Sequence, residues 1–137
     1  MVWVPGPTVI SPRVDKEGWH HFFTLGTYTN LTDSTAKQDN PFPLRGFNEI
    51  ILEDLSVGIV AASAGIVFKG VFQDIVNGVV RSAVHPNVWT TVYAEDYFHE
   101  LLNAYFYLQT RPLYLSFYMI GATGTDLCDF SLFGRCR

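Results

Sequence analysis

Short runs of apolar, aromatic and β-branched residues alternate with turn residues along most of this chain of 137 residues. Runs of about four to eight such residues, bounded by Gly, Pro, Asn or Asp, predict β-strands. The predicted strands cover residues 20–30, 47–55, 88–94, 105–109 and 113–120, with two more flanking a turn at Asn77-Gly78. Together they predict an all-β fold, an antiparallel β-sandwich of about seven to nine strands.

Two stretches between the predicted strands receive other assignments. Residues 31–44 are rich in Thr, Asp, Ser and Pro, a composition that predicts a loop. Residues 95–103 predict a short helical connection, because Tyr97 and Leu101 are four residues apart and would share one face of a helix. Acidic residues at the start of this segment also suit the N-terminus of a helix.

The clearest local signal is the dipeptide Asn77-Gly78 between two β-branched runs. Both residues tolerate positive φ angles, so the pair favours the type I′ turn of a two-residue hairpin. The register of this hairpin places Asp74 opposite Arg81, and cross-strand pairs of opposite charge stabilise a sheet. We therefore predict an Asp74–Arg81 ion pair.

The sandwich domain is expected at residues 20–122, preceded by an extended arm and followed by a tail at residues 123–137. The arm, residues 1–19, contains several prolines, which exclude a helix and a position inside a sheet. Its apolar side chains need a surface to lie on, either that of their own domain or that of a neighbour. Arm and tail together supply the candidates for contact with other subunits: Trp3, Val4, Ile10, Phe130 and Phe133.

Two cysteines, Cys128 and Cys136, lie near the end of the chain. Zinc sites use pairs of cysteines about two to four residues apart and four ligands in all, so this spacing does not indicate a metal site. A disulfide between the two cysteines would close a short loop. The alternative is two unlinked thiols, which a reducing compartment favours.

Acidic residues outnumber basic ones, 13 against 9, and the net charge is -4. This balance excludes nucleic-acid binding through a basic patch. The longest uncharged run, residues 55–68, is shorter than the ~20 apolar residues of a membrane-spanning helix. The first residues lack the basic and apolar regions of a signal peptide. We therefore expect no transmembrane segment and synthesis in the cytoplasm.

The histidines and acidic residues follow no known catalytic pattern. His99-Glu100 lacks the second histidine of the zinc-protease motif, because position 103 is Asn. His20 and His21 are adjacent in a predicted strand and would point to opposite faces of it. No nucleophile elbow or phosphate-binding loop is present in the sequence. The sequence predicts a protein that is not an enzyme and uses no cofactor or metal.

Residues 46–54 (GFNEIILED) form an early predicted strand with a charged end, and residues 90–98 (TTVYAEDYF) a strand followed by a turn. With the proline-rich arm, this order of elements resembles the small β-sandwich structural proteins of phage and virus particles, which are often jelly-roll-like. The resemblance implies a jelly-roll-like, non-enzymatic structural subunit: a capsid, cement, vertex or tail-associated protein. Such a subunit would reside in the virion as a homo-oligomer and contact other virion proteins.

Two other functions stay open. A binding module for carbohydrate or a host receptor would display Tyr or Trp beside Asp or Asn in a groove. However, 11 of the aromatic residues are Phe, which cannot hydrogen-bond to a sugar, and this favours the core and subunit contacts. A small β-barrel enzyme or metal protein would rely on histidines brought together by folding: His20, His21, His85 or His99.

Overall fold

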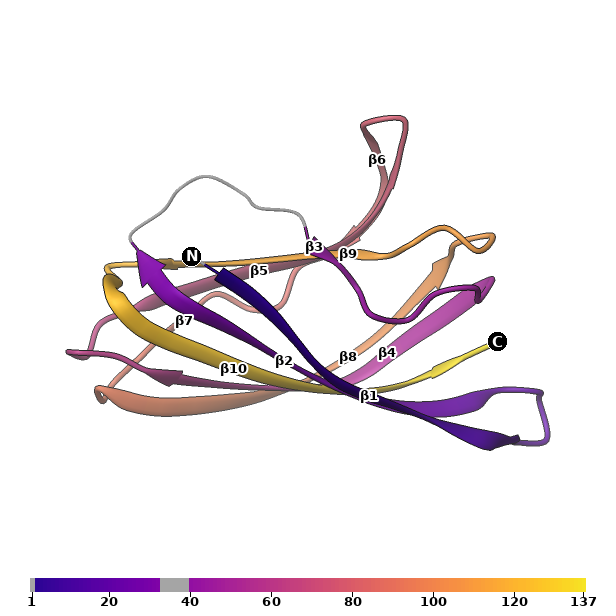
Figure 1. The fold of residues 1–137 in the computed structure, drawn as a ribbon, viewed down its shortest axis with the longest axis horizontal. Coiled ribbons are helices and arrows are strands. Elements are labelled where there is room, and N and C mark those ends of the chain that lie inside the picture. Colours follow the sequence, from indigo (N-terminus) through magenta and orange to yellow (C-terminus); the bar gives the residue numbers. More distant parts are fainter. Residues whose placement is uncertain (1, 33–39) are drawn as a thin grey trace.

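The computed structural model describes residues 2–32 and 40–137, which form two layers of antiparallel β-sheet (Figure 1). The first sheet has the strand order β1-β2-β10-β4-β8, with bounds Val2–Val14, His20–Thr32, Thr123–Cys136, Glu49–Val60 and Glu95–Tyr107. The second sheet has the order β3-β9-β5-β6, with bounds Asn40–Pro41, Tyr114–Ile120, Val67–Val76 and Val79–Val84, and β7 (Trp89–Thr90) pairs with β5.

The two sheets confirm the predicted all-β sandwich, with ten strands among the described residues in place of about seven to nine. The jelly-roll-like connectivity stays a prediction. Residues 33–39 of the predicted loop at 31–44 lie outside the described residues. The described part of the chain contains no helix, and so none with the length and apolar character needed to cross a bilayer.

The core between the sheets is built largely from aromatic rings. The ring of Phe117 on β9 lies 5.6 Å from Tyr28, 5.1 Å from Phe68, 5.7 Å from Phe72 and 5.2 Å from Phe130, measured between centroids. Successive side chains of a strand point to opposite faces, so these rings occupy the inward positions of β2, β5, β9 and β10. Tilted and edge-to-face rings at such distances add stabilisation beyond the area that they bury.

The N-terminal segment, expected as an arm at residues 1–19, contributes β1 at the edge of the first sheet. It pairs with β2, and the register shifts after Pro5 and after Ile10. Proline is tolerated at a sheet edge because its missing N–H interrupts no ladder on the open side. Trp3 stacks on Phe130, with ring centroids 5.5 Å apart and an angle of 9° between the planes. The segment is thereby anchored on the core of its own molecule.

The C-terminal segment 123–137, expected as a tail, contributes β10 at the centre of the first sheet, between β2 and β4. Its inward side chains include Phe130 and Leu132, which are 2% and 0% exposed. The prediction that Phe130 contacts another subunit is therefore wrong. Alternate residues from 128 to 132 are apolar, the period of a half-buried strand, although Gly and Asp in the same stretch gave it the composition of a loop.

The two cysteines both lie on β10 and cannot form a disulfide. Cys128 and Cys136 are buried and free. The stretch of extended strand between them spans ~26 Å, whereas a disulfide requires Cα atoms about 4.4–6.8 Å apart. Burial raises the pKa of Cys136 to about 11 and raises the pKa of Cys128 as well. Of the two alternatives left open by the sequence, a disulfide and two unlinked thiols, the structure has the unlinked thiols.

Residues 95–103, predicted as a helical connection, belong to β8, so that prediction is wrong. Exposure alternates along the strand: Tyr97 and Leu101 face outward, whereas Phe98 and Leu102 pack against the core. Residues four apart share a face in a strand as well as in a helix, because four is a multiple of the strand period of two. The alternation continues to Tyr107, and pairing with β4 along this length stabilises the extended form.

The β5–β6 hairpin turns at Asn77 and Gly78, whose φ angles are 52° and 77°. Positive φ at both central residues is the requirement of a type I′ turn. Val76 and Val79 pair on either side of the turn, and the turn end of the hairpin projects beyond the rest of the sandwich (Figure 1).

The predicted ion pair between Asp74 and Arg81 does not form. A register shift between Asp74 and Ile75 places Asp74 opposite Ser82, and Arg81 is exposed. The carboxylate of Asp74 accepts hydrogen bonds from Nη2 of Arg111 at 2.8 Å and from its Nε at 3.3 Å. Asp74 is only 3% exposed, so its charge requires a partner on the side facing the protein, and Arg111 lies there.

Candidate functional site

The outer face of the first sheet, on the side away from the core, carries large apolar side chains. Antiparallel sheets that pack on one side normally present polar residues on the other. Here eight large side chains from β1, β4, β8 and β10 are each at least 46% exposed. They are Val4, Val9, Val60, Tyr97, Leu101, Tyr105, Tyr107 and Phe133. We refer to this surface as the apolar face.

One row of paired residues crosses the whole sheet. Val9 pairs with Phe23, Phe23 with Phe133, Phe133 with Asp54, and Asp54 with Leu101. The rings of Phe23 and Phe133 are 4.7 Å apart. Directly opposed side chains in neighbouring strands touch one another, so the row forms a nearly continuous apolar strip interrupted only by Asp54.

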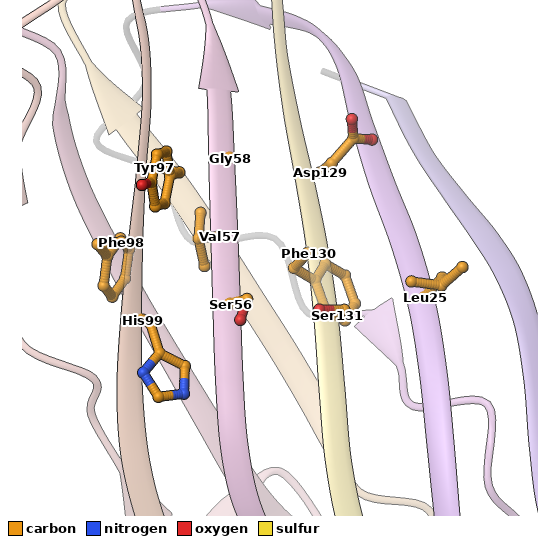
Figure 2. A pocket seen from close by; sticks show the side chains of 10 residues that line it. All are labelled: Leu25, Ser56, Val57, Gly58, Tyr97, Phe98, His99, Asp129, Phe130 and Ser131. Atoms are coloured by element: carbon orange, nitrogen blue, oxygen red, sulfur yellow. The ribbon is translucent and has the colours of Figure 1, made fainter.

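A shallow hollow of about 370 Å³ lies in the same face (Figure 2). The hollow forms because small residues lie next to one another on neighbouring strands. Ser131 pairs with Ser56, and Gly58 carries no side chain. Larger side chains surround them: Leu25, Tyr97, His99 and Asp129. Tyr97 is 81% exposed, and its ring stands at the border of the hollow.

Carboxylates gather at one end of the hollow. Asp129 accepts a hydrogen bond from Oγ1 of Thr27 at 2.7 Å. Asp96 accepts one from the backbone N–H of Val92 at 2.7 Å, and this donor, with other backbone N–H groups, lowers the pKa of Asp96 despite partial desolvation. Glu95 is exposed beside them. No Lys or Arg of the described chain lines this part of the surface, so it is anionic at neutral pH.

The residue types of a hydrolytic triad also occur on this face. Nε2 of His99 contacts Oδ1 of Asp54, and Ser56 pairs with His99 in the register of β4 and β8. The imidazole points away from Ser56 (Figure 2), and no hydrogen bond joins the two within the described residues. The His99 side chain is 54% exposed, so water competes at its ring. This arrangement does not activate Ser56 as a nucleophile.

Two of the other histidines, His20 and His21, have local partners, and His85 is exposed. Nδ1 of His20 lies 2.8 Å from the backbone oxygen of Ser11, and Nε2 of His21 lies 3.6 Å from Oδ2 of Asp15. Residues 2–32 and 40–137, as far as their side chains are described, contain no group of three or more His, Cys, Asp or Glu positioned to hold a metal ion.

The predicted contact residues are divided between surface and core. Val4, Ile10 and Phe133 are 46%, 38% and 51% exposed. Trp3 is half-buried, because its ring packs on Tyr28 and Phe130. Only part of the predicted set is therefore free to meet another molecule.

The exposed apolar and aromatic residues of β8 were not among the contact residues predicted from the sequence. Tyr97, Leu101, Tyr105 and Tyr107 are each more than half exposed on the apolar face. The helical assignment of residues 95–103 concealed Tyr97 and Leu101, and the prediction of a separate strand at 105–109 left Tyr105 and Tyr107 outside the same pattern. Their odd-numbered spacing, continued through Tyr107, is the period-two signal that could have identified them.

No protein-family model matches this chain, and no curated protein matches its sequence. Among solved structures, the chain is similar to one in "Structure of infectious bursal disease virus Gx strain", with 9% sequence identity and a TM-score of 0.40. The match covers 96% of this chain and 42% of the other, so this chain spans less than half the length of that one. The chain thus has a weak structural resemblance to a protein of a virus particle, in the layout of the β-sandwich alone.

Proposed function

We propose that this chain is a non-enzymatic structural subunit that associates with copies of itself and with other proteins of a viral or phage particle. The observation that supports this function is the apolar face. Contiguous apolar surface of more than a few hundred Å² on a folded domain marks an interaction site. The particle setting rests on the order of sequence elements, which resembles the sandwich proteins of such particles.

The mechanism would be burial of rigid apolar surface. Removal of apolar area from water contributes about 25 cal/mol per Å², and stable interfaces bury ~800 Å² on each partner. Association costs translational freedom and the ordering of side chains. Aromatic and β-branched side chains on paired strands lose little rotamer freedom on binding. The apolar face therefore suits association by burial of apolar surface.

Sedimentation velocity over about two decades of concentration tests the proposal, because mass action drives self-association. We expect the weight-average mass to rise above the 15.4 kDa of one chain as concentration increases. Electron microscopy of the concentrated sample should then show discrete particles or oligomers. A chain that stays at 15.4 kDa throughout would overturn the proposed function.

A second candidate function is binding of carbohydrate or of a host receptor. The hollow supports it, since the exposed ring of Tyr97 lies beside the polar groups of Asp129 and Ser131. Pockets that combine an apolar surface with a few polar groups orient small ligands. A glycan array probed with the wild-type chain and with Tyr97→Ser tests this function. Signals that the substitution abolishes would support it, and an array without signal would count against carbohydrate as the ligand.

A further inference from the structure

A cleft of about 520 Å³ lies between the projecting β5–β6 hairpin and the C-terminal end of β8. The hairpin contributes Asp74, Val76 and Arg81, and the other side contributes Tyr105, Tyr107 and Arg111. The cleft therefore combines an aliphatic side chain, two aromatic rings and two cations with one carboxylate.

Internal contacts hold most of these groups in place. Arg111 is paired with Asp74 at 2.8 Å, so their charges cancel. The phenol of Tyr105 donates a hydrogen bond to Oε1 of Glu49 at 2.5 Å, and Glu49 also accepts one from Nε of Arg137 at 2.5 Å. The walls of the cleft are thus shaped before anything binds.

Arg81 differs from the other charged groups of the cleft. It is exposed and has no ion-pair or hydrogen-bond partner among the described residues. The register shift at Asp74 and Ile75 leaves it outside the cross-strand pairing. The cleft therefore offers one uncompensated positive charge beside two aromatic rings.

The opposite end of β8 has complementary properties. There Tyr97 projects with 81% of its surface exposed, and Glu95, Asp96 and Asp129 line the same part of the surface. We refer to this projection as the Tyr97 corner. It presents an aromatic ring within an anionic field, the counterpart of a cationic cleft lined by tyrosines.

We propose that the cleft of one copy receives the Tyr97 corner of a second copy. The ring of Tyr97 lies between the hairpin and the rings of Tyr105 and Tyr107, and its flanking carboxylates meet Arg81. This inference rests on the proposed function, since it names one contact through which copies associate. The chain as a whole carries a net charge of -4 and copies repel one another, so a contact between opposite charges selects this orientation.

The Tyr97 corner of a molecule cannot enter the cleft of that same molecule. Tyr97 and Tyr105 lie on the same strand, ~26 Å apart along it. Each copy therefore carries one corner and one cleft, and both require a neighbour.

Two variants that each lose one half of the contact provide the test. Tyr97→Ser removes the ring but keeps the cleft, and Arg81→Glu alters the cleft but keeps the corner. Both sites are exposed, so the fold should tolerate the changes, which circular dichroism and thermal unfolding verify. Val88→Ser, at a 62% exposed position, and Arg45→Glu, at another exposed arginine, serve as matched controls.

Sedimentation velocity should show that each variant alone associates at least tenfold more weakly than the wild-type chain, whereas the controls do not. An equimolar mixture should recover association, because the intact Tyr97 of one variant can enter the intact cleft of the other. The recovered contact should weaken as salt rises, since partly exposed charges are screened.

Three results would contradict the inference in distinguishable ways. A wild-type chain that never associates overturns the proposed function and this contact with it. Association of the wild type that neither variant weakens overturns the contact alone. Variants that fail singly and also fail as a mixture show that the two regions do not meet, and this too overturns the contact.

Discussion

The two faces of the first sheet are made from the same strands and differ in what covers them. Phe130 and Phe133 lie on β10, yet Phe130 is 2% exposed and Phe133 is 51% exposed. The second sheet packs over the inner face, and nothing in the described chain packs over the outer one. Apolar character alone therefore does not determine which face becomes the core. The outer face carries large apolar side chains but lacks a second layer among the described residues, and under the proposed function another molecule supplies that layer.

Two glycines of the first sheet show the same difference between its inner and outer faces. A Cβ atom on Gly26, which faces inward, would lie 2.6 Å from Cζ of Phe130 and would also meet the ring of Trp3. A Cβ atom on Gly58, which faces outward, would have no neighbour within 4 Å. The inner face has no room for an additional carbon atom at Gly26, whereas the outer face has room for one at Gly58, in the hollow.

The largest expected effect comes from truncating one phenylalanine on each face. Phe130→Ala should lower the free energy of unfolding by about 3–5 kcal/mol, because it leaves a cavity among packed rings. Phe133→Ala should cost about 1 kcal/mol or less, because it loses mainly its contact with Phe23. Urea titrations of both variants at a concentration where the chain is monomeric provide the measurement. Equal losses would remove the distinction between the two faces.

A smaller effect is expected from adding one methyl group to each face. Gly26→Ala should destabilise by about 1–3 kcal/mol, because the new carbon overlaps the rings of Trp3 and Phe130. Gly58→Ala should stabilise by about 0.5 kcal/mol, because alanine loses less backbone entropy than glycine and has room at this position. Thermal unfolding compares the two directly, and destabilisation at Gly58 would show that the outer face is less open than described.

The smallest expected effect is a change of stability with pH, which arises from carboxylates outside the core. The guanidinium of Arg137 lowers the pKa of Glu49, and the backbone N–H of Val92 lowers the pKa of Asp96. A carboxyl group whose pKa is lower in the folded state contributes stability above its unfolded pKa of about 4, and this contribution is lost as pH falls through the folded pKa. Stability should therefore decline on acidification.

Glu49→Gln tests the source of this decline. In urea unfolding between neutral and acidic pH, this variant should show a shallower dependence on pH than the wild type. Phe130→Ala should instead shift the whole profile downward without changing its slope. If Glu49→Gln left the slope unchanged, other groups would be responsible for the acid sensitivity.

Sequence alone predicted correctly those features of the fold that depend on residues close together in the chain. The turn at Asn77-Gly78 depends on two residues that tolerate positive φ, and the sandwich class depends on short apolar runs between turn residues. The ion partner of Asp74 could not be predicted in this way. It depends on a register shift in the hairpin and on the position of Arg111, which tertiary structure brings close.

The candidate site was only partly accessible from sequence for a related reason. Val4, Ile10 and Phe133 were identified as apolar residues of the terminal segments, but whether such a residue is covered depends on how the sheets stack. Phe130 shares that composition and lies in the core. On β8, the spacing of four between Tyr97 and Leu101 fits both helix and strand, and pairing with β4 decides between them.

The central claim, that the apolar face is an association surface and not a part of the folding core, is tested most directly by Leu101→Ser combined with Phe133→Ser. Both residues lie in the row that crosses the sheet and are 64% and 51% exposed. The association constant and the unfolding free energy of the monomer would be measured on the same preparation. We predict at least a tenfold loss in association and a change in unfolding free energy within about 1 kcal/mol. Unchanged association, or a collapse of monomer stability, would contradict the account.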